Sequence, residues 1–271
     1  FTTTSARTND LLIPEKYALE GALYVSNEQK LSPRLSVSYG LRVSAFSQMG
    51  PGAANTYGTV DDQPITTVDH GKGEVIKTYW GPEPRVSGSY VLTEFSSVKA
   101  AYNRTRQYIH LLSNAGTSAP TDLWYPSTNN VAPQIGDQVS LGYFRNVKDN
   151  TYETSVEVYY KDMQNLIDYK NGADILLNPN VESELLYGTG KAYGVELFVK
   201  KTKGKLTGWV GYTLSRSERT MAELNNGNAY PNRYDRTHDA SAVVMYQLNE
   251  KWKLSAAWVY ATGNAVTYPE G

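Results

Sequence analysis

Three histidines and no cysteine limit the chemistry that this sequence can carry. Without thiols, neither a disulfide framework nor a thiolate metal site can form. His238 precedes Asp239, as a base precedes the carboxylate that orients it, but neighbours on a strand point to opposite faces. Ser217 and Asp235 lie far from any Gly-x-Ser-x-Gly elbow, and no phosphate-binding glycine loop is present. The sequence therefore predicts no enzyme and no cofactor, and His238 is interpreted as a residue at the junction of a loop and a strand.

A group of acidic residues in the long polar link over residues 48–84 is a candidate metal site. It consists of Asp61, Asp62, Asp69, His70 and Glu74. Hard oxygen ligands suit calcium, but the regular Asp-x-Asp-x-Asp-Gly spacing of a calcium loop is absent. We expect a solvated loop here and no metal site, with a bound ion as the alternative.

Apolar and polar residues alternate in about ten segments, and this alternation defines the expected elements. In residues 34–46, Leu35, Val37, Tyr39, Leu41, Val43 and Ala45 alternate with Ser36, Ser38, Gly40, Arg42 and Ser44. Successive side chains of a strand point to opposite faces, so each segment is expected to be a strand with one apolar side. The other segments are residues 17–25, 86–92, 97–112, 138–143, 153–160, 193–200, 206–215, 239–248 and 252–260.

The links between these segments are alternately short and long. Short links are expected at residues 27–33, 93–96, 146–151, 201–205 and 249–251, and long ones at 48–84, 113–135, 169–187 and 218–237. Outer-membrane barrels combine short periplasmic turns with long extracellular loops, whereas a sandwich has no reason to sort its loops by length. The pattern predicts an all-β fold, an antiparallel transmembrane β-barrel portion in the bacterial outer membrane. A propeller or solenoid is the alternative, but the strands lack a fixed repeat period.

Composition and dimensions agree with this fold. The chain has 22 tyrosines and five phenylalanines, and tyrosine favours strands and polar–apolar boundaries. A mean hydropathy of −0.48 is compatible with a barrel, and no apolar run is long enough for a spanning helix. Trp252 and Tyr260 differ by about 20 Å in height at a typical strand tilt, close to the roughly 25 Å apolar band of such barrels. A net charge of −1 gives no electrostatic footprint for nucleic acid.

Charged residues on the polar side of the strands are expected to face the lumen. They are Glu20, Arg42, Lys99, Glu153, Glu157 and Glu196. A charge that faces lipid near the midplane costs a few kcal/mol, which excludes the opposite orientation. Hydration of the wall and ion pairs with a plug, the domain that fills the lumen of some large barrels, are the favoured roles. A lumenal path for substrate is the alternative.

Four residues in the long links are candidates for ligand contact: Trp124, Tyr125, Arg233 and Tyr234. Aromatic side chains such as Trp124 and Tyr125 could stack on a sugar or peptide, because they supply apolar contact with few rotors to freeze. They could equally anchor the loop at the membrane interface or pack loops together, and we favour that interpretation. Arg233 and Tyr234 lie in a run, Arg233 to Arg236, that is more typical of pairing near the start of a strand.

Several stretches resemble the C-terminal barrel region of TonB-dependent receptors, especially those of Bacteroidetes type. They are PRVSGSYVL (residues 84–92), SVKAAYNRTRQ (97–107), AYGVEL (192–197), LTGWVGYTLSRS (206–217), YPNRYDRTHD (230–239) and WVYATGN (258–264). The similar segments occur in the order of the family and cover the chain from about Tyr17 onward.

The resemblance implies a role in transport. The complete protein would be a 22-stranded barrel with an N-terminal plug, importing a nutrient with energy from TonB. Residues 1–271 would then be a single region, a partial barrel of about ten strands without plug or TonB box, cut at both ends from a longer precursor. The implied partners are outer-membrane lipid, an extracellular nutrient and, through the plug, the TonB complex. The alternative is a structural barrel subunit of a surface complex that docks a lipoprotein through its long loops.

Overall fold

The computed structural model describes residues 15–58, 63–112, 123–173 and 178–265. Its strands are β1 (Tyr17–Lys30), β2 (Leu35–Met49), β3 (Gly52–Tyr57), β4 (Pro64–His70), β5 (Val75–Thr93), β6 (Ser96–Gln107), β7 (Ile109–Leu112), β8 (Leu123–Pro126), β9 (Gln134–Val147), β10 (Tyr152–Tyr169), β11 (Leu185–Lys201), β12 (Leu206–Met221), β13 (Tyr230–Pro231), β14 (His238–Gln247) and β15 (Lys253–Ala261). Two 3₁₀ turns, η1 (Val181–Glu184) and η2 (Asn225–Gly227), complete the described elements. No helix in these ranges is long and apolar enough to cross a membrane.

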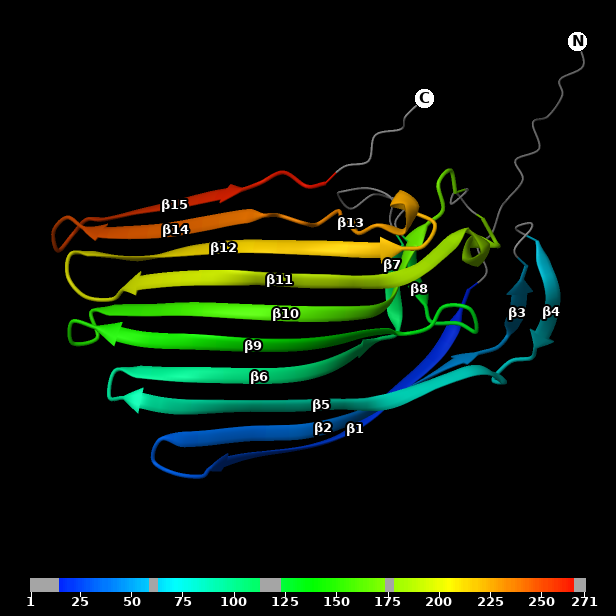
Figure 1. Ribbon diagram of the computed structural model, residues 1–271, viewed down its shortest axis with the longest axis horizontal. Coiled ribbons are helices and arrows are strands. Elements are labelled where there is room, and N and C mark those ends of the chain that lie inside the picture. The colour runs from blue at the N-terminus through cyan, green and yellow to red at the C-terminus, as the bar shows by residue number, and fades with distance from the viewer. Residues whose placement is uncertain (1–14, 59–62, 113–122, 174–177, 266–271) are drawn as a thin grey trace, which may run out of the picture.

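One large antiparallel sheet makes up most of the molecule. Its strands follow the order β1-β2-β5-β6-β9-β10-β11-β12-β14-β15, and the short β13 pairs with β12. This order follows the chain, with only β3–β4, β7–β8 and β13 lying between successive strands, so the sheet is a continuous meander (Figure 1). Two hairpins, β3–β4 and β7–β8, form separate small sheets. The predicted all-β antiparallel architecture is confirmed.

The two faces of the sheet differ as the alternation predicts. On β2, Leu41 and Val43 are 43 % and 38 % exposed, whereas Ser44 and Phe46 are buried. We call the face that carries Leu41 and Val43 the outer face, and the face that carries Arg42 and Ser44 the inner face. Cross-strand partners share a face, so the registers assign every strand to these two sides. The outer face is apolar yet exposed, which is the arrangement of a wall that borders on a non-aqueous medium.

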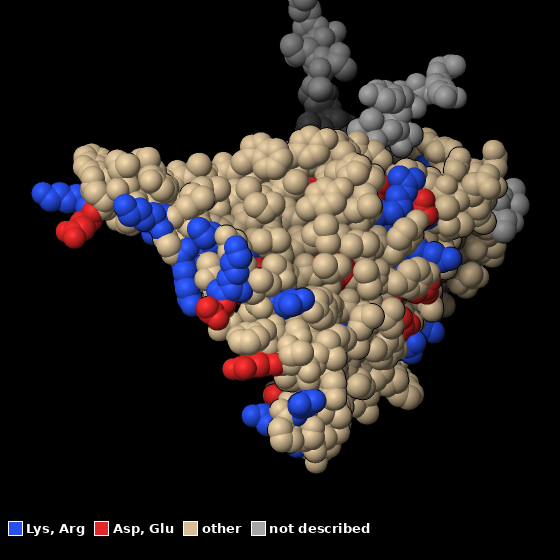
Figure 2. Space-filling view, turned by 60° about the vertical axis from the view of Figure 1, so that its left-hand side comes forward, with Lys and Arg blue, Asp and Glu red and all other residues tan. Residues whose placement is uncertain are grey.

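A row of tyrosines ends the apolar area of the outer face. The cross-strand row runs Tyr102, Val139, Tyr160 and Tyr193, and the next row toward the long loops runs Arg104, Asp137, Asp162 and Lys191. Arg104 makes two 2.8 Å bonds to Asp137, whose carboxylate also accepts the Tyr102 hydroxyl at 2.7 Å. Tyrosine rings followed by charges mark the boundary between an apolar medium and water. Figure 2 shows a mainly uncharged surface between charged side chains at its two ends.

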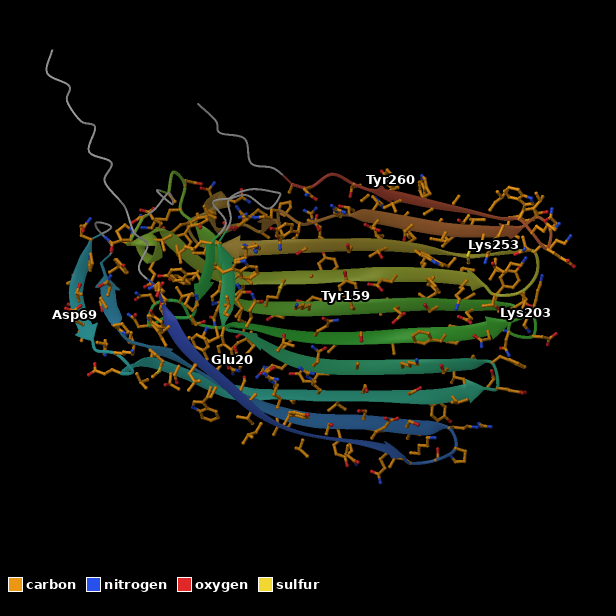
Figure 3. The ribbon with its side chains drawn as sticks, turned by 180° about the vertical axis from the view of Figure 1, so that it is seen from behind. Glu20, Asp69, Tyr159, Lys203, Lys253 and Tyr260 are labelled. Atoms are coloured by element: carbon orange, nitrogen blue, oxygen red, sulfur yellow. The ribbon has the colours of Figure 1, made fainter. Side chains whose placement is uncertain are left out.

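Short turns gather at one end of the sheet and long connections at the other, as the sequence predicts. The short turns are residues 31–34, 94–95, 148–151, 202–205 and 248–252. Lys203 and Lys253 lie at this turn end, and Asp69 lies at the opposite, loop end (Figure 3). The sheet therefore has two chemically different ends.

The predicted long link at residues 48–84 is partly wrong. Strand β5 begins at Val75, and residues 51–74 contain the hairpin β3–β4. Strand β5 contains Pro82 and Pro84, and proline cannot donate to a ladder. In the structure β5 pairs with β2 over this stretch, whereas its pairing with β6 ends at Arg85. The prolines therefore lie where β5 is an edge strand, which is where a sheet tolerates them.

A candidate ligand-binding cleft at the loop end

A bulge changes the face to which the end of β10 turns its side chains. Pairing between β10 and β11 shifts register between Gln164 and Leu166, and the intervening Asn165 has a φ of 57°. Asparagine adopts this left-handed conformation more readily than most residues, and here its Nδ2 donates to the Pro133 carbonyl at 2.8 Å. One extra residue moves the following side chains to the other face. Asp168 therefore lies on the inner face, where unbroken alternation would have placed it outside.

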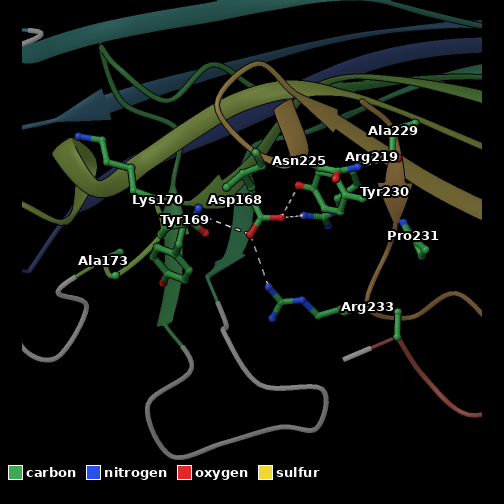
Figure 4. A pocket seen from close by; sticks show the side chains of 14 residues that line it. Asp168, Tyr169, Lys170, Ala173, Arg219, Asn225, Ala229, Tyr230, Pro231 and Arg233 are labelled. Atoms are coloured by element: carbon green, nitrogen blue, oxygen red, sulfur yellow. Dashed lines mark hydrogen bonds and ion pairs between the residues drawn. The ribbon is translucent and has the colours of Figure 1, made fainter. Parts of the chain in front are cut away.

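Asp168 is the centre of a charged group, the Asp168 cluster, that also contains Arg219, Tyr230 and Arg233. The Tyr230 hydroxyl donates to Oδ2 of Asp168 at 2.9 Å, and Arg219 Nη1 is 3.4 Å from the same oxygen. Arg233 Nη2 is 3.8 Å from Oδ1 (Figure 4). Strand β13 places Tyr230 directly opposite Arg219. Two guanidinium groups therefore share one carboxylate at the loop end of the inner face.

The cluster lines a cleft of about 840 Å³ between the β10–β11 and β12–β14 connections. Other lining residues are Tyr169, Lys170, Asn171, Gly172, Ala173, Leu224, Asn225, Ala229, Pro231 and Ala265. Lys170 also lines this cleft. Burial, reinforced by the charge of Asp168, raises the pKa of Tyr230, so its hydroxyl remains a hydrogen-bond donor. The volume falls within the range of about 300–1,000 Å³ that is usual for small-molecule sites.

A smaller cavity of about 140 Å³ adjoins the cleft. It shares Asp168, Tyr169, Arg219 and Arg233 with the cleft and adds Gln107, Leu111, Leu112, Gln134, Ile167 and Tyr234. The Asp168 cluster therefore stands between two hollows, and a ligand bound in either one lies beside its charges.

A small apolar core holds the loops in place behind the cleft. It contains Leu112, Tyr125, Val131, Ile167, Val181 and Leu185, contributed by β7, β8, the β8–β9 link, β10, η1 and β11. These residues are distant in sequence, and their burial joins the segments that carry them into one packed unit, which we call the loop unit. Ile167 precedes Asp168 directly, so this core also fixes the position of the cluster.

Glu182 of η1 ties four segments of the chain together, in what we call the Glu182 network. Its Oε1 accepts the Tyr125 hydroxyl at 2.6 Å, and its Oε2 accepts from Asn130 Nδ2. Lys16, next to the start of β1, has its Nζ 3.5 Å from the same carboxylate and 4.8 Å from the centre of the Tyr125 ring. Asn130 Nδ2 also donates to the Asn55 carbonyl at 2.9 Å. Burial and the Glu182 charge raise the pKa of Tyr125, which therefore stays a donor.

His110 of β7 makes this loop unit sensitive to acid. Its Nε2 lies 3.0 Å from Ser127 Oγ, and its buried Nδ1 has no partner among the described residues. Burial lowers the pKa of His110 from 6.5 to about 4, because the charged form is poorly solvated. The unfolded loop binds the proton more tightly than the folded loop does. The folded loop therefore keeps its full stability above about pH 6.5 and loses stability as the pH falls toward 4.

We expect hydrogen-exchange protection of the β7 and β8 amides in the intact protein to fall between pH 7 and pH 4.5, after correction for intrinsic rates. The loss is at most about 3 kcal/mol, from the difference between the two pKa values. In His110→Gln, which cannot titrate, this pH dependence should largely vanish. If the two proteins lost protection equally, His110 would not be its source.

The four candidate ligand residues lie in different environments. Tyr125 is only 4 % exposed and belongs to the loop core, whereas the adjacent Trp124 is 65 % exposed. Arg233 lines both hollows, and Tyr234 lines the smaller one. The structure therefore brings Arg233 and Tyr234 together with Asp168 and leaves Trp124 and Tyr125 out of the cleft. A ligand-binding role for all four remains a prediction.

The six charged residues of the polar strand sides share the inner face. Glu20 is opposite Phe46, and Arg42 lies 3.9 Å from Glu20 and 3.6 Å from Glu83. Lys99 Nζ is 4.5 Å from the centre of the Phe144 ring.

The other members of this set lie on β10 and β11. Lys200 Nζ donates to Glu153 at 3.1 Å, and Glu157 stands opposite Glu196. Glu153, Glu157 and Glu196 also line a surface hollow of about 460 Å³ toward the turn end of the sheet. Their role in a water-filled lumen stays a prediction.

Asp168, Arg219 and Tyr230 were not recognised as site residues from the sequence. By simple alternation Asp168 continues the side of Tyr160, which is the outer face, and only the bulge reverses it. The left-handed Asn165 was the available signal, but an isolated asparagine in a strand is weak evidence for a bulge.

Residues that were weighed for metal or catalytic chemistry show ordinary contacts. His70 Nδ1 is 3.7 Å from Glu74, whose Oε2 accepts the Gly71 amide at 2.8 Å. Asp61 and Asp62 lie outside the described residues, and within the described ranges no three potential ligands gather. His238 begins β14 and its Nδ1 is 2.7 Å from the Tyr212 hydroxyl.

Comparison with known proteins agrees with this architecture. The family model described as "TonB dependent receptor-like, beta-barrel" matches residues 2–270. The FrpB iron transporter from Neisseria meningitidis (F3-3 variant) is similar with 13 % identity and a TM-score of 0.60, over 90 % of this chain and 33 % of that one. The alcaligin outer membrane receptor FauA from Bordetella pertussis follows with 15 % identity and a TM-score of 0.57, over 91 % and 38 %.

The ferric yersiniabactin uptake receptor FyuA from Yersinia pestis has 16 % identity and a TM-score of 0.55, over 89 % of this chain and 33 % of its own. At such identities the likeness shows the fold alone, and the chain spans about a third of the length of these structures. No curated protein matches it. The family match places the sheet in the bacterial outer membrane, with its exposed apolar face toward lipid. From its match over residues 2–270, the chain belongs to the TonB-dependent receptor-like β-barrel family.

Proposed function

We propose that this chain is part of the wall of a receptor that imports a nutrient across the outer membrane with energy from TonB. The observation that carries the proposal is the family match over residues 2–270. The sheet agrees with it, because its outer face is apolar and its inner face is polar. Structurally similar proteins include an iron transporter and siderophore receptors. The cleft at the loop end is where such a ligand would first bind.

The open edges of the sheet support a larger assembly. Among the described strands, β1 and β15 each pair on one side only. An unpaired strand edge within a bilayer leaves backbone groups without partners, at several kcal/mol for each group. We infer that further strands pair with both edges and close a barrel, about twelve of them if the total is the 22 of plugged transporters. A plug inside this barrel would contact the inner face and reach TonB.

Energy-dependent uptake by the intact receptor tests this function. A strain that lacks the receptor gene would be grown on a panel of limiting iron complexes, copper, cobalamin, oligosaccharides and peptides, with and without the gene restored. We expect at least one source to support growth only when both the receptor and TonB are present. Growth that depends on the receptor but persists without TonB would contradict the proposal, as would a panel with no receptor-dependent source.

A further inference from the structure

The β9–β10 and β11–β12 turns carry an excess of positive charge at the turn end of the sheet. Residues 145–151 and 201–205 contain five cations and a single carboxylate. We call these five cations the basic collar: Arg145, Lys148, Lys201, Lys203 and Lys205. The β14–β15 turn at the same end adds Lys251 and Lys253 against Glu250 (Figure 3). This end of the wall is therefore cationic, although the whole chain has a net charge of −1.

The charges of the basic collar are not neutralised by neighbouring carboxylates. Four of its side chains are exposed and that of Lys201 is half-buried. None of the five forms a salt bridge with any residue that the structure describes, whereas Lys200 on the inner face lies 3.1 Å from Glu153. Lys203 Nζ donates to the backbone carbonyl of Asp149 and not to its carboxylate. The collar therefore presents free positive charge to its surroundings.

Hydrogen bonds between the two turns hold the collar together. The Thr202 amide donates to the Thr151 carbonyl at 2.9 Å, and the Thr202 hydroxyl donates to the Asn150 carbonyl at the same distance. The turns belong to neighbouring hairpins, because β10 pairs with β11. Cations from both turns are thus fixed beside one another and not scattered along the sheet.

The charged row at the loop end of the same outer face is different, because its cations are compensated. Arg104 makes two 2.8 Å bonds to Asp137, and Arg216 Nε lies 3.0 Å from Glu218. Lys191 stands opposite Glu218 on one side and a second carboxylate on the other. An unneutralised excess is therefore a property of the turn end and not of charged residues at the boundary in general.

The position of the collar along the strands places it at the height of lipid headgroups. Tyr160 belongs to the tyrosine row, and Tyr152 lies eight residues earlier on the same face of β10. Eight residues at a typical strand tilt span about 20 Å in height, close to the roughly 25 Å apolar band of such barrels. Tyr152 stands directly opposite Lys201, and Lys148 Nζ is 5.7 Å from the centre of the Tyr152 ring. The collar therefore borders the second edge of the apolar band.

We propose that the basic collar binds the acidic headgroups of phospholipids in the periplasmic leaflet of the outer membrane. The short turns of outer-membrane barrels face the periplasm, so the phosphates of that leaflet lie at the height of the collar. Lysine and arginine can keep their apolar stems against acyl chains while their charged ends reach the phosphates. Each such charge near an acidic lipid surface strengthens association about fivefold. The inference concerns the lipid around the wall and does not depend on the imported nutrient.

Spin-labelled lipids test this surface on the intact receptor in vesicles of phosphatidylcholine. The vesicles would contain a trace of spin-labelled phosphatidylglycerol or of spin-labelled phosphatidylcholine, and the immobilised fraction of each label reports its affinity for the protein surface. We expect the receptor to favour phosphatidylglycerol by about two- to fivefold, an average over all lipid positions around the wall. This preference should shrink as salt is added, because the collar is exposed and its charges are screened.

Variants of the collar lysines show whether their charge causes the preference. The triple variant that combines Lys148→Gln, Lys201→Gln and Lys203→Gln should lose most of it. Arginine at the same three positions keeps the charge and should keep the preference, which separates loss of charge from a disturbed turn.

A matched control removes the same charge from the opposite end of the sheet. It replaces three exposed lysines at the loop end by glutamine: Lys72, Lys77 and Lys191. The total charge of this control equals that of the collar variant, and we expect it to prefer phosphatidylglycerol as the unmodified receptor does.

Three results would overturn the inference. The first is an unmodified receptor without preference for phosphatidylglycerol, and the second is an equal loss in the collar variant and in the loop-end control, which would indicate a response to total charge alone. The third concerns peptidoglycan, which also lies in the periplasm and carries carboxylates. If the collar variant lost binding to purified peptidoglycan sacculi but kept its lipid preference, the collar would serve the cell wall and not the membrane. None of these results bears on TonB-dependent uptake.

Discussion

Leu197→Arg should destabilise the membrane-inserted protein by about 2–4 kcal/mol, the cost of an arginine on the lipid face of a barrel near the midplane. Leu197 lies on the outer face, opposite Val156 and Tyr212, and is 42 % exposed. On the same strand and face, the tyrosine row passes through Tyr193 on one side and Lys201 ends the strand on the other. Leu197 is midway between them, where the bilayer is most apolar. The measurement is the free energy of unfolding of the intact receptor in lipid bilayers.

The adjacent Glu196→Arg is the matched control. It introduces the same side chain one residue away, on the inner face opposite Glu157. The substitution replaces a pair of like charges with a pair of opposite charges at Glu157. We therefore expect the free energy of unfolding to change by less than about 1 kcal/mol. Equal losses for Leu197→Arg and Glu196→Arg would show that the two faces do not differ in environment.

Glu182→Ala should lower the free energy of local unfolding of the loop unit by about 3 kcal/mol, without disturbing the large sheet. The substitution removes the acceptor of Tyr125 and Asn130 and the counter-ion of Lys16. Buried donors that lose a charged acceptor cost about 1–3 kcal/mol each. Hydrogen exchange should show faster exchange in β8 and η1, while β9 to β12 keep their protection.

Two further variants delimit this effect. Tyr125→Phe removes one hydrogen bond but leaves the ring in the loop core, so about 1–2 kcal/mol is expected. Asp149→Ala, in the exposed turn after β9, should leave the loop unit unchanged. Protection of β8 that is insensitive to Glu182→Ala would mean that the apolar core alone holds the loops.

The strands of the wall could be predicted because each has one side in an apolar medium and one in water. On β2 this contrast imposes a period of two over residues 39–48. The start of β5 was not predicted. Pro82 and Pro84 are tolerated in it because β6 does not pair with this part of β5. That is a property of the neighbouring strand, which the local sequence does not contain.

The loop end was less predictable because its contacts join segments that are distant in sequence. Glu182 meets Tyr125 across 57 positions and Lys16 across 166. Asp168 reaches the cleft through the single extra residue Asn165, and a shift of one residue reverses every following side chain. Arg233 was singled out by its residue type, but its partner Asp168 was not, since no pattern links the two.

The central claim is that the outer face of each strand borders on lipid and the inner face on water. The sequence has no cysteine, so single cysteines can be introduced in this chain at positions 156–160 and spin-labelled in the intact receptor in bilayers. Labels at Val156, Val158 and Tyr160 should be relaxed by oxygen, which dissolves in lipid, and those at Glu157 and Tyr159 by a water-soluble nickel complex. Protection of Val156 and Val158 from both reagents would place them in a dry protein interior and contradict the account.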